Sequence, residues 1–240
     1  GVSDVRLPVN SKEAASLLSL RRGVFAKRNI KKGEAISIEN VFFAFPPVDG
    51  QFTANDWSKY FSFHATKNID INDAIAPSNS IKKDSREKIW DIVKKVRVLL
   101  KESNVVIPGS AELEISHHYG LEKFHEYGLT MLTVVNRDYC KKLLVSLPGQ
   151  KHPEQYHKEK EETFHVLFGT VEIELNGKAQ TCSPGDVVTI EPETRHAFVS
   201  SGGAVIEEIS STHFLNDSFY TDTKISANKQ RKTILTHWMG

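Results

Sequence analysis

Short apolar runs separated by tight turns fill residues 143–210, and this pattern most limits what the chain can fold into. Residues 170–180 alternate apolar and polar side chains, as in a strand that buries one face. The dipeptide Asn176-Gly177 lies within that stretch and is the strongest short signal for a two-residue hairpin turn. Further strands are expected at 143–149, 185–200 and 204–210. Strands at this spacing predict a β-barrel or a β-sandwich.

The stretches before this region have different patterns. Up to about residue 80, short apolar runs broken by turns such as Lys31-Lys32-Gly33-Glu34 predict a small, mostly β domain. Residues 84–103 carry apolar side chains at three- and four-residue spacing, which predicts an amphipathic helix. We therefore expect a mostly β chain, with a small β domain over 1–80, a connecting helix over 81–104 and a β-barrel domain over 105–240.

The composition excludes several classes of partner. The 240 residues include 31 basic and 30 acidic side chains, and a net charge of +1 gives no reason to expect nucleic acid or an anionic membrane surface. No apolar run reaches the roughly 18–20 residues of a membrane span. Cys140 and Cys182 lack motif spacing, which fits a reducing, cytoplasmic location. The chain begins with Gly1 rather than Met, so we expect either a tag remnant or a fragment cut from a longer protein.

Residues 149–169 and 185–200 resemble the two sequence motifs of the cupin family. The first motif reads a glycine, H-x-H, a glutamate and a closing glycine, and here Gln155-x-His157 and Glu162 stand at those spacings between Gly149 and Gly169. The second motif reads a glycine, a strand, a turn and a histidine, which is His196 here. The resemblance implies a cupin β-barrel (jelly roll), with Gln155 in the place of the first motif histidine.

This spacing has a geometric reason. Gln155 and His157 are two residues apart and share one face of a strand, while Glu162 and His196 lie on later strands, so a small barrel brings all four to one interior point. Two imidazoles, a carboxylate and an amide oxygen suit Mn²⁺, Fe²⁺, Zn²⁺ or Ni²⁺, although the amide is the poorer donor. His152 is an alternative ligand but has the opposite strand parity to His157. The alternative to a metal is an interior in which His and Glu only hydrogen-bond each other.

Within the cupins, residues 140–164 and 207–219 are similar to the D-lyxose-isomerase-like branch. This resemblance implies a divalent metal, typically Mn²⁺, and the interconversion of an aldose and a ketose. The metal ligands carried over are the same four residues. Lys142 and one of Glu207 and Glu208 become candidates for substrate binding and proton transfer. Strand alternation lets only one of the two glutamates point inward, and the sequence leaves open which one.

Residues 14–78 resemble the antifreeze-like (SAF) domain that closes the C-terminus of sialic acid synthases. The matched elements are the Arg21-Arg22 pair, the V-F-A strand, the I-K-K-G-E turn, the S-I-E-N segment and the closing prolines. In those synthases an arginine of this pair helps to bind an N-acylmannosamine sugar, so Arg21 or Arg22 would take that role here. The alternative is that both arginines lie on a solvated strand edge.

The two resemblances together imply the SAF plus cupin portion of a sialic acid synthase-like protein of nonulosonate and surface-polysaccharide biosynthesis, without the phosphoenolpyruvate-using catalytic domain. The cupin is then expected to bind a divalent metal and a small sugar, as an isomerase or epimerase, in a homodimer. The alternative is a non-catalytic sugar-binding or dimerisation module that regulates the synthase. Oxygenase chemistry on a two-histidine, one-carboxylate site is a weaker third possibility.

Other polar groups of the second half are expected outside the site. His165 should face outward, because it lies three residues after Glu162 on a strand. His117 and His118 are expected to be solvated or at a subunit contact. Residues 158–161, with their alternating lysines and glutamates, are expected to form a solvated connection between strands, although a lysine there could reach a sugar hydroxyl or carboxylate.

Overall fold

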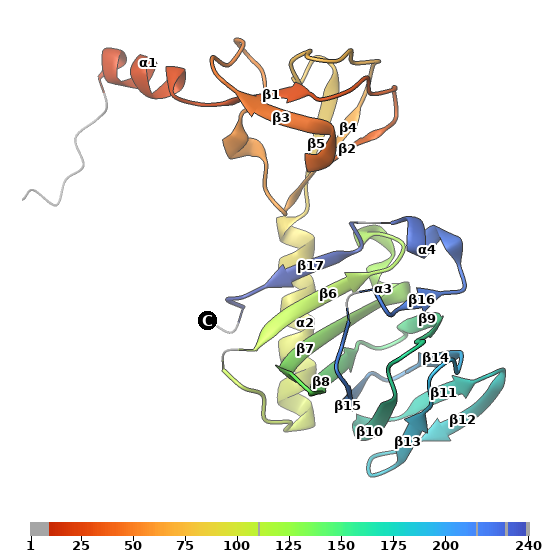
Figure 1. Ribbon diagram of the computed structural model, residues 1–240. Coiled ribbons are helices and arrows are strands. Elements are labelled where there is room, and N and C mark those ends of the chain that lie inside the picture. Colours follow the sequence, from red (N-terminus) through yellow and green to blue (C-terminus); the bar gives the residue numbers. More distant parts are fainter. Residues whose placement is uncertain (1–9, 110, 215, 229, 239–240) are drawn as a thin grey trace, which may run out of the picture. The chain divides into compact units, whose positions relative to one another are not determined.

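The computed structural model describes residues 10–109, 111–214, 216–228 and 230–238, and most of its regular elements are strands (Figure 1). The mostly β fold expected from the sequence is therefore confirmed. The chain divides into two compact units, residues 1–87 and 88–240. Within the described ranges, no helix combines the length and the apolar character needed to cross a bilayer.

The first unit pairs its short strands into two small sheets. The first sheet pairs β1 (Gly23–Ala26) with β3 (Val41–Ala44), and the second places β4 (Phe61–Ala65) between β2 (Ala35–Ile36) and β5 (Ser80–Asp84). The unit also contains α1 (Ser11–Ser19) and the short 3-10 helices η1 (Ile38–Asn40) and η2 (Ala54–Asp56). Its core consists of the buried residues Val24, Ala26, Ile30, Ile36, Val41, Phe63, Ala65, Ile69 and Ile75.

A close contact explains one departure from the SAF pattern, the glycine that follows Arg21-Arg22. A Cβ atom built on Gly23 would lie only 2.5 Å from the side chain of Gln51. Gln51 is buried, and its amide donates to the carbonyl of Val24 at 2.9 Å. A larger residue than glycine would push this buried amide out of place.

The amphipathic helix lies where its periodicity predicts. α2 (Arg86–Ser103) begins two residues later than expected, because β5 extends to Asp84. Asn104 follows it with a φ of 52°, a left-handed conformation that ends the helix. The apolar stripe of the helix is buried and consists of Ile89, Ile92, Val93, Val96, Leu99 and Leu100.

The second unit is a jelly roll built from a seven-stranded and a five-stranded sheet (Figure 1). The larger sheet runs in the order β13 (Val187–Ile190), β10 (Glu162–Gly169), β15 (Ala204–Ser211), β8 (Tyr139–Ser146), β7 (Gly128–Asn136), β6 (Glu112–His117) and β17 (Lys232–Leu235). The smaller runs β12 (Lys178–Cys182), β11 (Val171–Leu175), β14 (His196–Val199), β9 (Lys151–Tyr156) and β16 (Phe219–Tyr220). The short helices are η3 (Leu121–Lys123), α3 (Phe124–Tyr127) and α4 (Thr223–Ala227).

Residues from both sheets meet in one apolar core, which includes Leu144, Phe164, Val166, Ile173, Phe198 and Ile206. The predicted hairpin joins β11 to β12 through Asn176-Gly177, whose φ values of 48° and 79° match a type I′ turn. Beside this core, polar side chains of the same inner faces line a pocket, so the fold itself turns charged groups toward its interior.

Candidate metal centre and pocket

Three buried residues from different strands converge on one point inside the jelly roll. His157 directly follows β9, Glu162 begins β10 and His196 begins β14. One side-chain atom of each lies within 4.8 Å of the others. The Glu162 carboxylate places one oxygen 3.4 Å from Nε2 of His157 and the other 3.3 Å from Nε2 of His196. Each of the three side chains is at most 3% exposed, so water contributes little to their solvation.

Main-chain carbonyls fix the orientation of both imidazoles. Nδ1–H of His157 donates to the carbonyl of Asp217, and Nδ1–H of His196 donates to the carbonyl of Thr194 at 3.0 Å. In this tautomer both Nε2 atoms carry a lone pair that faces Glu162, as in metal-binding histidines held by an outer carbonyl. Two buried atoms, Nε2 of His157 and Oε2 of Glu162, have no hydrogen-bond partner among the described residues. A cation bound between them would satisfy both, so these residues fit a metal ion.

The protonation states suit a divalent cation. Burial lowers the pKa of His196, which keeps its imidazole neutral. Burial alone would raise the pKa of Glu162, but the charge of the Lys160 ammonium outweighs burial and holds that pKa well below its usual range. A neutral imidazole and an ionised carboxylate are the forms that bind metals such as Mn²⁺, Fe²⁺, Zn²⁺ or Ni²⁺.

Gln155 lies beside this group, on β9, as its strand parity predicts. Its amide nitrogen is 3.3 Å from Nε2 of His196, and the side chain is 9% exposed. A half-turn of the amide would present its oxygen to the same point. The four predicted ligand residues therefore lie together, with one amide in place of an imidazole.

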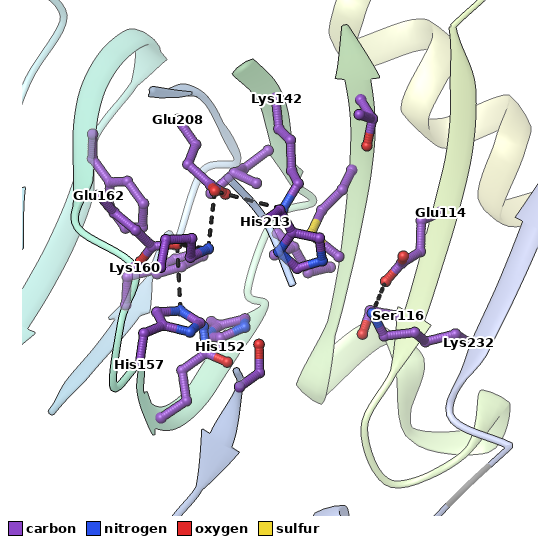
Figure 2. A pocket seen from close by; sticks show the side chains of 18 of the residues that line it. Glu114, Ser116, Lys142, His152, His157, Lys160, Glu162, Glu208, His213 and Lys232 are labelled. Atoms are coloured by element: carbon purple, nitrogen blue, oxygen red, sulfur yellow. Dashed lines mark hydrogen bonds and ion pairs between the residues drawn. The ribbon is translucent and has the colours of Figure 1, made fainter. Parts of the chain in front are cut away.

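A second set of buried charges adjoins the first and is centred on Glu208. Its Oε1 is 3.1 Å from Nζ of Lys160, 3.5 Å from Nζ of Lys142 and 3.1 Å from the hydroxyl of Ser210, which donates to it. Lys160 also forms an ion pair with Glu162, so a single ammonium joins the two carboxylates (Figure 2). Burial lowers the pKa of Lys160, but the two carboxylates outweigh burial and raise it.

The structure distinguishes between the two glutamates that the sequence left open. In β15, Glu208 pairs with Lys142 of β8 and points into the pocket. Glu207 lies on the opposite face, where it contacts Lys141 at 2.6 Å and His165 at 3.3 Å. Glu207 does not line the pocket, so its candidacy as a group that touches the substrate is not supported. His165 faces outward, as its parity predicts.

Three expectations about buried polar groups were wrong. Lys160 is 3% exposed instead of solvated, because the Asp217 carboxylate accepts the N–H groups of residues 158–160 and folds this connection inward. His117 and His118 are 6% and 1% exposed, and their rings bond to Thr233 and to Tyr220. For His117 the available signal was the alternation of β6, in which it has the parity of Leu113 and Ile115.

His152 also lies inside the pocket, against its predicted parity. The pairing of β14 with β9 shifts register, so that His196 faces Gln155 whereas Phe198 faces His152. This bulge rotates His152 inward, where its ring stacks on Phe198 at 4.7 Å. His152 is not among the residues whose ligand atoms lie within 4.8 Å of one another, so it lines the pocket without joining the candidate ligands.

The pocket has a volume of about 180 Å³, which is room for many water molecules or a small polar ligand. Figure 2 shows the Glu208 and Glu162 region on one side and Glu114, Ser116 and Lys232 on the other, with His213 between them. Sequence reasoning missed His213 and the β6–β17 side of the wall, and it offered a lysine of residues 158–161 only as an alternative. Arg21 and Arg22, the predicted sugar-binding pair, belong to the first unit, where both are exposed and Arg22 lies 5.9 Å from the ring of Phe43.

Comparison with known proteins identifies both units. Residues 143–209 match the cupin domain model, and residues 21–61 match the SAF domain model. The D-lyxose/D-mannose isomerase of Thermosediminibacter oceani is 32% identical over 171 residues, which cover 58% of this chain and 94% of that protein. The D-lyxose ketol-isomerase of Thermofilum sp. is 26% identical over 172 residues, or 60% of this chain and 92% of that one. The predicted SAF and cupin domains, and the similarity to D-lyxose isomerases, are confirmed.

Solved structures agree with the fold. The L-ribose isomerase of Geodermatophilus obscurus superposes with a TM-score of 0.52 at 14% identity, covering 62% of this chain and 97% of that one. A putative spore coat polysaccharide biosynthesis protein E from Chromobacterium violaceum is 45% identical over 33% of this chain, with a TM-score of 0.31. The matched part is 24% of that protein, so this chain spans about a quarter of its length.

Proposed function

Since this chain belongs to the family of the D-lyxose/D-mannose isomerase, we propose that its cupin unit is a metal-dependent ketol-isomerase that interconverts a small aldose and its ketose. The observation that carries the proposal is the place of Glu208. It is a buried carboxylate in the same pocket as the His157–Glu162–His196 group and is joined to that group through Lys160.

Isomerisation moves a proton between two neighbouring carbons of the sugar, so it needs a base that can take the proton and give it back. Glu208 supplies a carboxylate whose oxygen is held by Lys142, Lys160 and Ser210, so it is positioned before the sugar arrives. The two ammonium groups also offer hydrogen bonds to sugar hydroxyls. The buried setting excludes bulk water from the transferred proton.

The donor set fits a divalent metal held by His157, Glu162 and His196, with the Gln155 amide as a fourth ligand. When bound, such a metal would polarise a sugar oxygen next to the carbon that loses its proton. Asp217 and Thr194 hold the two imidazoles in the ligating orientation through their carbonyls.

Proton exchange measured by NMR in D₂O tests this function. The full chain, loaded with Mn²⁺, is incubated with D-lyxose or D-mannose, and deuterium at C2 and ketose formation are followed. Glu208→Gln is expected to lower both rates by about 100-fold or more. Glu207→Gln is the matched control, because this neighbour lies on the outer face, and it should stay within about twofold of the wild type.

The outcomes separate the proposal from its main alternative. Full activity of Glu208→Gln would exclude Glu208 as the base. The alternative, a non-catalytic sugar-binding module, is favoured by one observation, the amide of Gln155 at a ligand position. Sugar binding without turnover or deuterium uptake, at every metal tested, would support that module and overturn the isomerase.

We also propose that the SAF unit serves a nonulosonate synthase in surface-polysaccharide biosynthesis, and that the chain works in the cytoplasm as a homodimer. The support is the SAF match and the exposure of Arg21 and Arg22 beside β1, where they are accessible to a sugar. Both cysteines are free and buried, in keeping with a reducing compartment. Binding of N-acetylmannosamine that Arg21→Gln and Arg22→Gln both leave unchanged would count against this role of the arginines.

A further inference from the structure

The pocket has a second polar end that the isomerisation chemistry does not use. It is built by β6, by Arg231 and by the start of β17, and the lining residues here are Glu114, Ser116, Arg231 and Lys232. Figure 2 shows Glu114, Ser116 and Lys232 across the pocket from Glu208 and Glu162. A sugar whose reacting carbons lie at Glu208 would therefore direct another of its substituents toward this end.

Arg231 stands out at this end because its charge is not matched. Lys232 pairs with Glu114, at 2.8 Å between Nζ and Oε1. Arg231 is partly buried, and its guanidinium lies 5.0 Å from the centre of the Tyr220 ring, with no carboxylate partner among the residues that the structure describes. Tyr220 is itself held by His118, at 3.1 Å from its hydroxyl. Stacking uses the flat face of a guanidinium and leaves its N–H edge available to an anion.

The charges that line the whole pocket also favour an anionic ligand. Four cations line it, Lys142, Lys160, Arg231 and Lys232, against the three carboxylates of Glu114, Glu162 and Glu208. His213 adds no charge to this balance, since burial lowers its pKa to about 3. A bound divalent metal would add further positive charge. A neutral sugar gains little from this excess, whereas a sugar with a negative substituent gains directly.

We propose that the pocket takes a monosaccharide that carries an anionic oxygen group, a carboxylate or a phosphate, and that Arg231 binds this group. The proposal rests on the proposed function only in the placement of the reacting carbons beside Glu208. The planar guanidinium suits the paired oxygens of either anion, and the partly open position of Arg231 leaves room for it.

Titration calorimetry on the Mn²⁺-loaded full chain tests the proposal with three matched sugars, D-mannose, D-mannuronate and D-mannose 6-phosphate. At least one anionic sugar is expected to bind about 10- to 100-fold more tightly than D-mannose, because hydrogen bonds to charged groups contribute that much. Arg231→Gln should reduce this preference to about twofold, and Arg231→Lys should keep part of it. Arg137→Gln is the control, since it removes the same charge from an exposed position outside the pocket lining and should keep the preference.

Each outcome decides one point. Tighter binding of mannuronate alone assigns a carboxylate, and of mannose 6-phosphate alone a phosphate. Equal binding of all three sugars, or a preference that survives in Arg231→Gln with an unchanged thermal unfolding midpoint, overturns the proposal. If anionic sugars bind through Arg231 but no sugar takes up deuterium, the isomerase fails while the anion subsite stands. If D-mannose is isomerised but anionic sugars bind no more tightly than D-mannose, the anion subsite fails while the isomerase stands.

Discussion

The carbonyl of Asp217 accepts the Nδ1–H of His157, and the carboxylate of the same residue accepts the N–H groups of Lys158 and Lys160 at 2.9 and 3.0 Å. Asp217, in the segment that follows β15, thus fixes both a candidate metal ligand and the lysine that joins Glu162 to Glu208. Asp217 touches no reacting atom, so it is a positioning residue.

Asp217→Ala is expected to weaken metal binding about 10- to 100-fold, because it frees the 158–160 connection and with it the orientation of His157. Asp217→Asn keeps one acceptor oxygen and should lose less. Competition with a chelator measures the affinity. Asp138→Ala, at an exposed position in the β7–β8 turn, should leave the affinity unchanged. Equal affinities for Asp217→Ala and the wild type would show that the ligands hold their place without Asp217.

Gln155→His is expected to tighten metal binding by about tenfold or more, since it replaces an amide oxygen by an imidazole next to His196. Gln155→Leu removes the fourth donor at similar volume and should weaken binding. The two variants bracket the contribution of this position in the same chelator competition. An affinity that is the same in all three proteins would mean that residue 155 does not reach the metal.

Lys160→Met tests the buried charge network without reference to activity. It leaves Glu162 and Glu208 buried without their shared ammonium, so the free energy of unfolding of the metal-free protein should fall by about 3–5 kcal/mol. Lys158→Met is the matched control, because Lys158 is exposed and lies only over the ring of Phe219, a contact that contributes about 1 kcal/mol at most. Urea unfolding curves measure both. Equal losses in the two variants would contradict a structural role for the Lys160 ion pairs.

Sequence patterns predicted the jelly roll, the hairpin at Asn176-Gly177 and the positions of Gln155 and His157, because these depend on strand alternation and turn chemistry alone. They could not predict the inward turn of His152, which depends on a bulge set by the pairing of β9 with β14. The choice between Glu207 and Glu208 likewise depends on which face of β15 meets the core, and that follows from register with β8.

The burial of Lys160 lay further beyond the sequence. A run of alternating lysines and glutamates is solvated in most settings, and only the acceptor on Asp217, 57 residues away, turns this one inward. His118 and Arg231 are about twice as far apart along the chain, and both contact Tyr220 at the pocket. Contacts of this kind carry no local signal, so they emerge only from the packed structure.

The buried His117 makes stability depend on pH in a direction that can be measured. Burial lowers its pKa from 6.5 to about 4, and the Arg231 charge also lowers it. The unfolded chain therefore binds the proton more readily than the folded protein between these two values, and stability falls as the pH falls from 6.5 toward 4. From pH 7 to pH 5 this residue alone should cost about 2 kcal/mol of unfolding free energy.

His117→Gln removes this titration and retains a group that can bond to the hydroxyl of Thr233. The loss of stability between pH 7 and pH 5 should then be smaller than in the wild type by about 2 kcal/mol. His64→Gln is the control, because that histidine is exposed and the substitution should leave the pH dependence as it is. Urea midpoints at the two pH values give the comparison. Parallel losses in the wild type and His117→Gln would mean that His117 keeps its ordinary pKa in the folded protein.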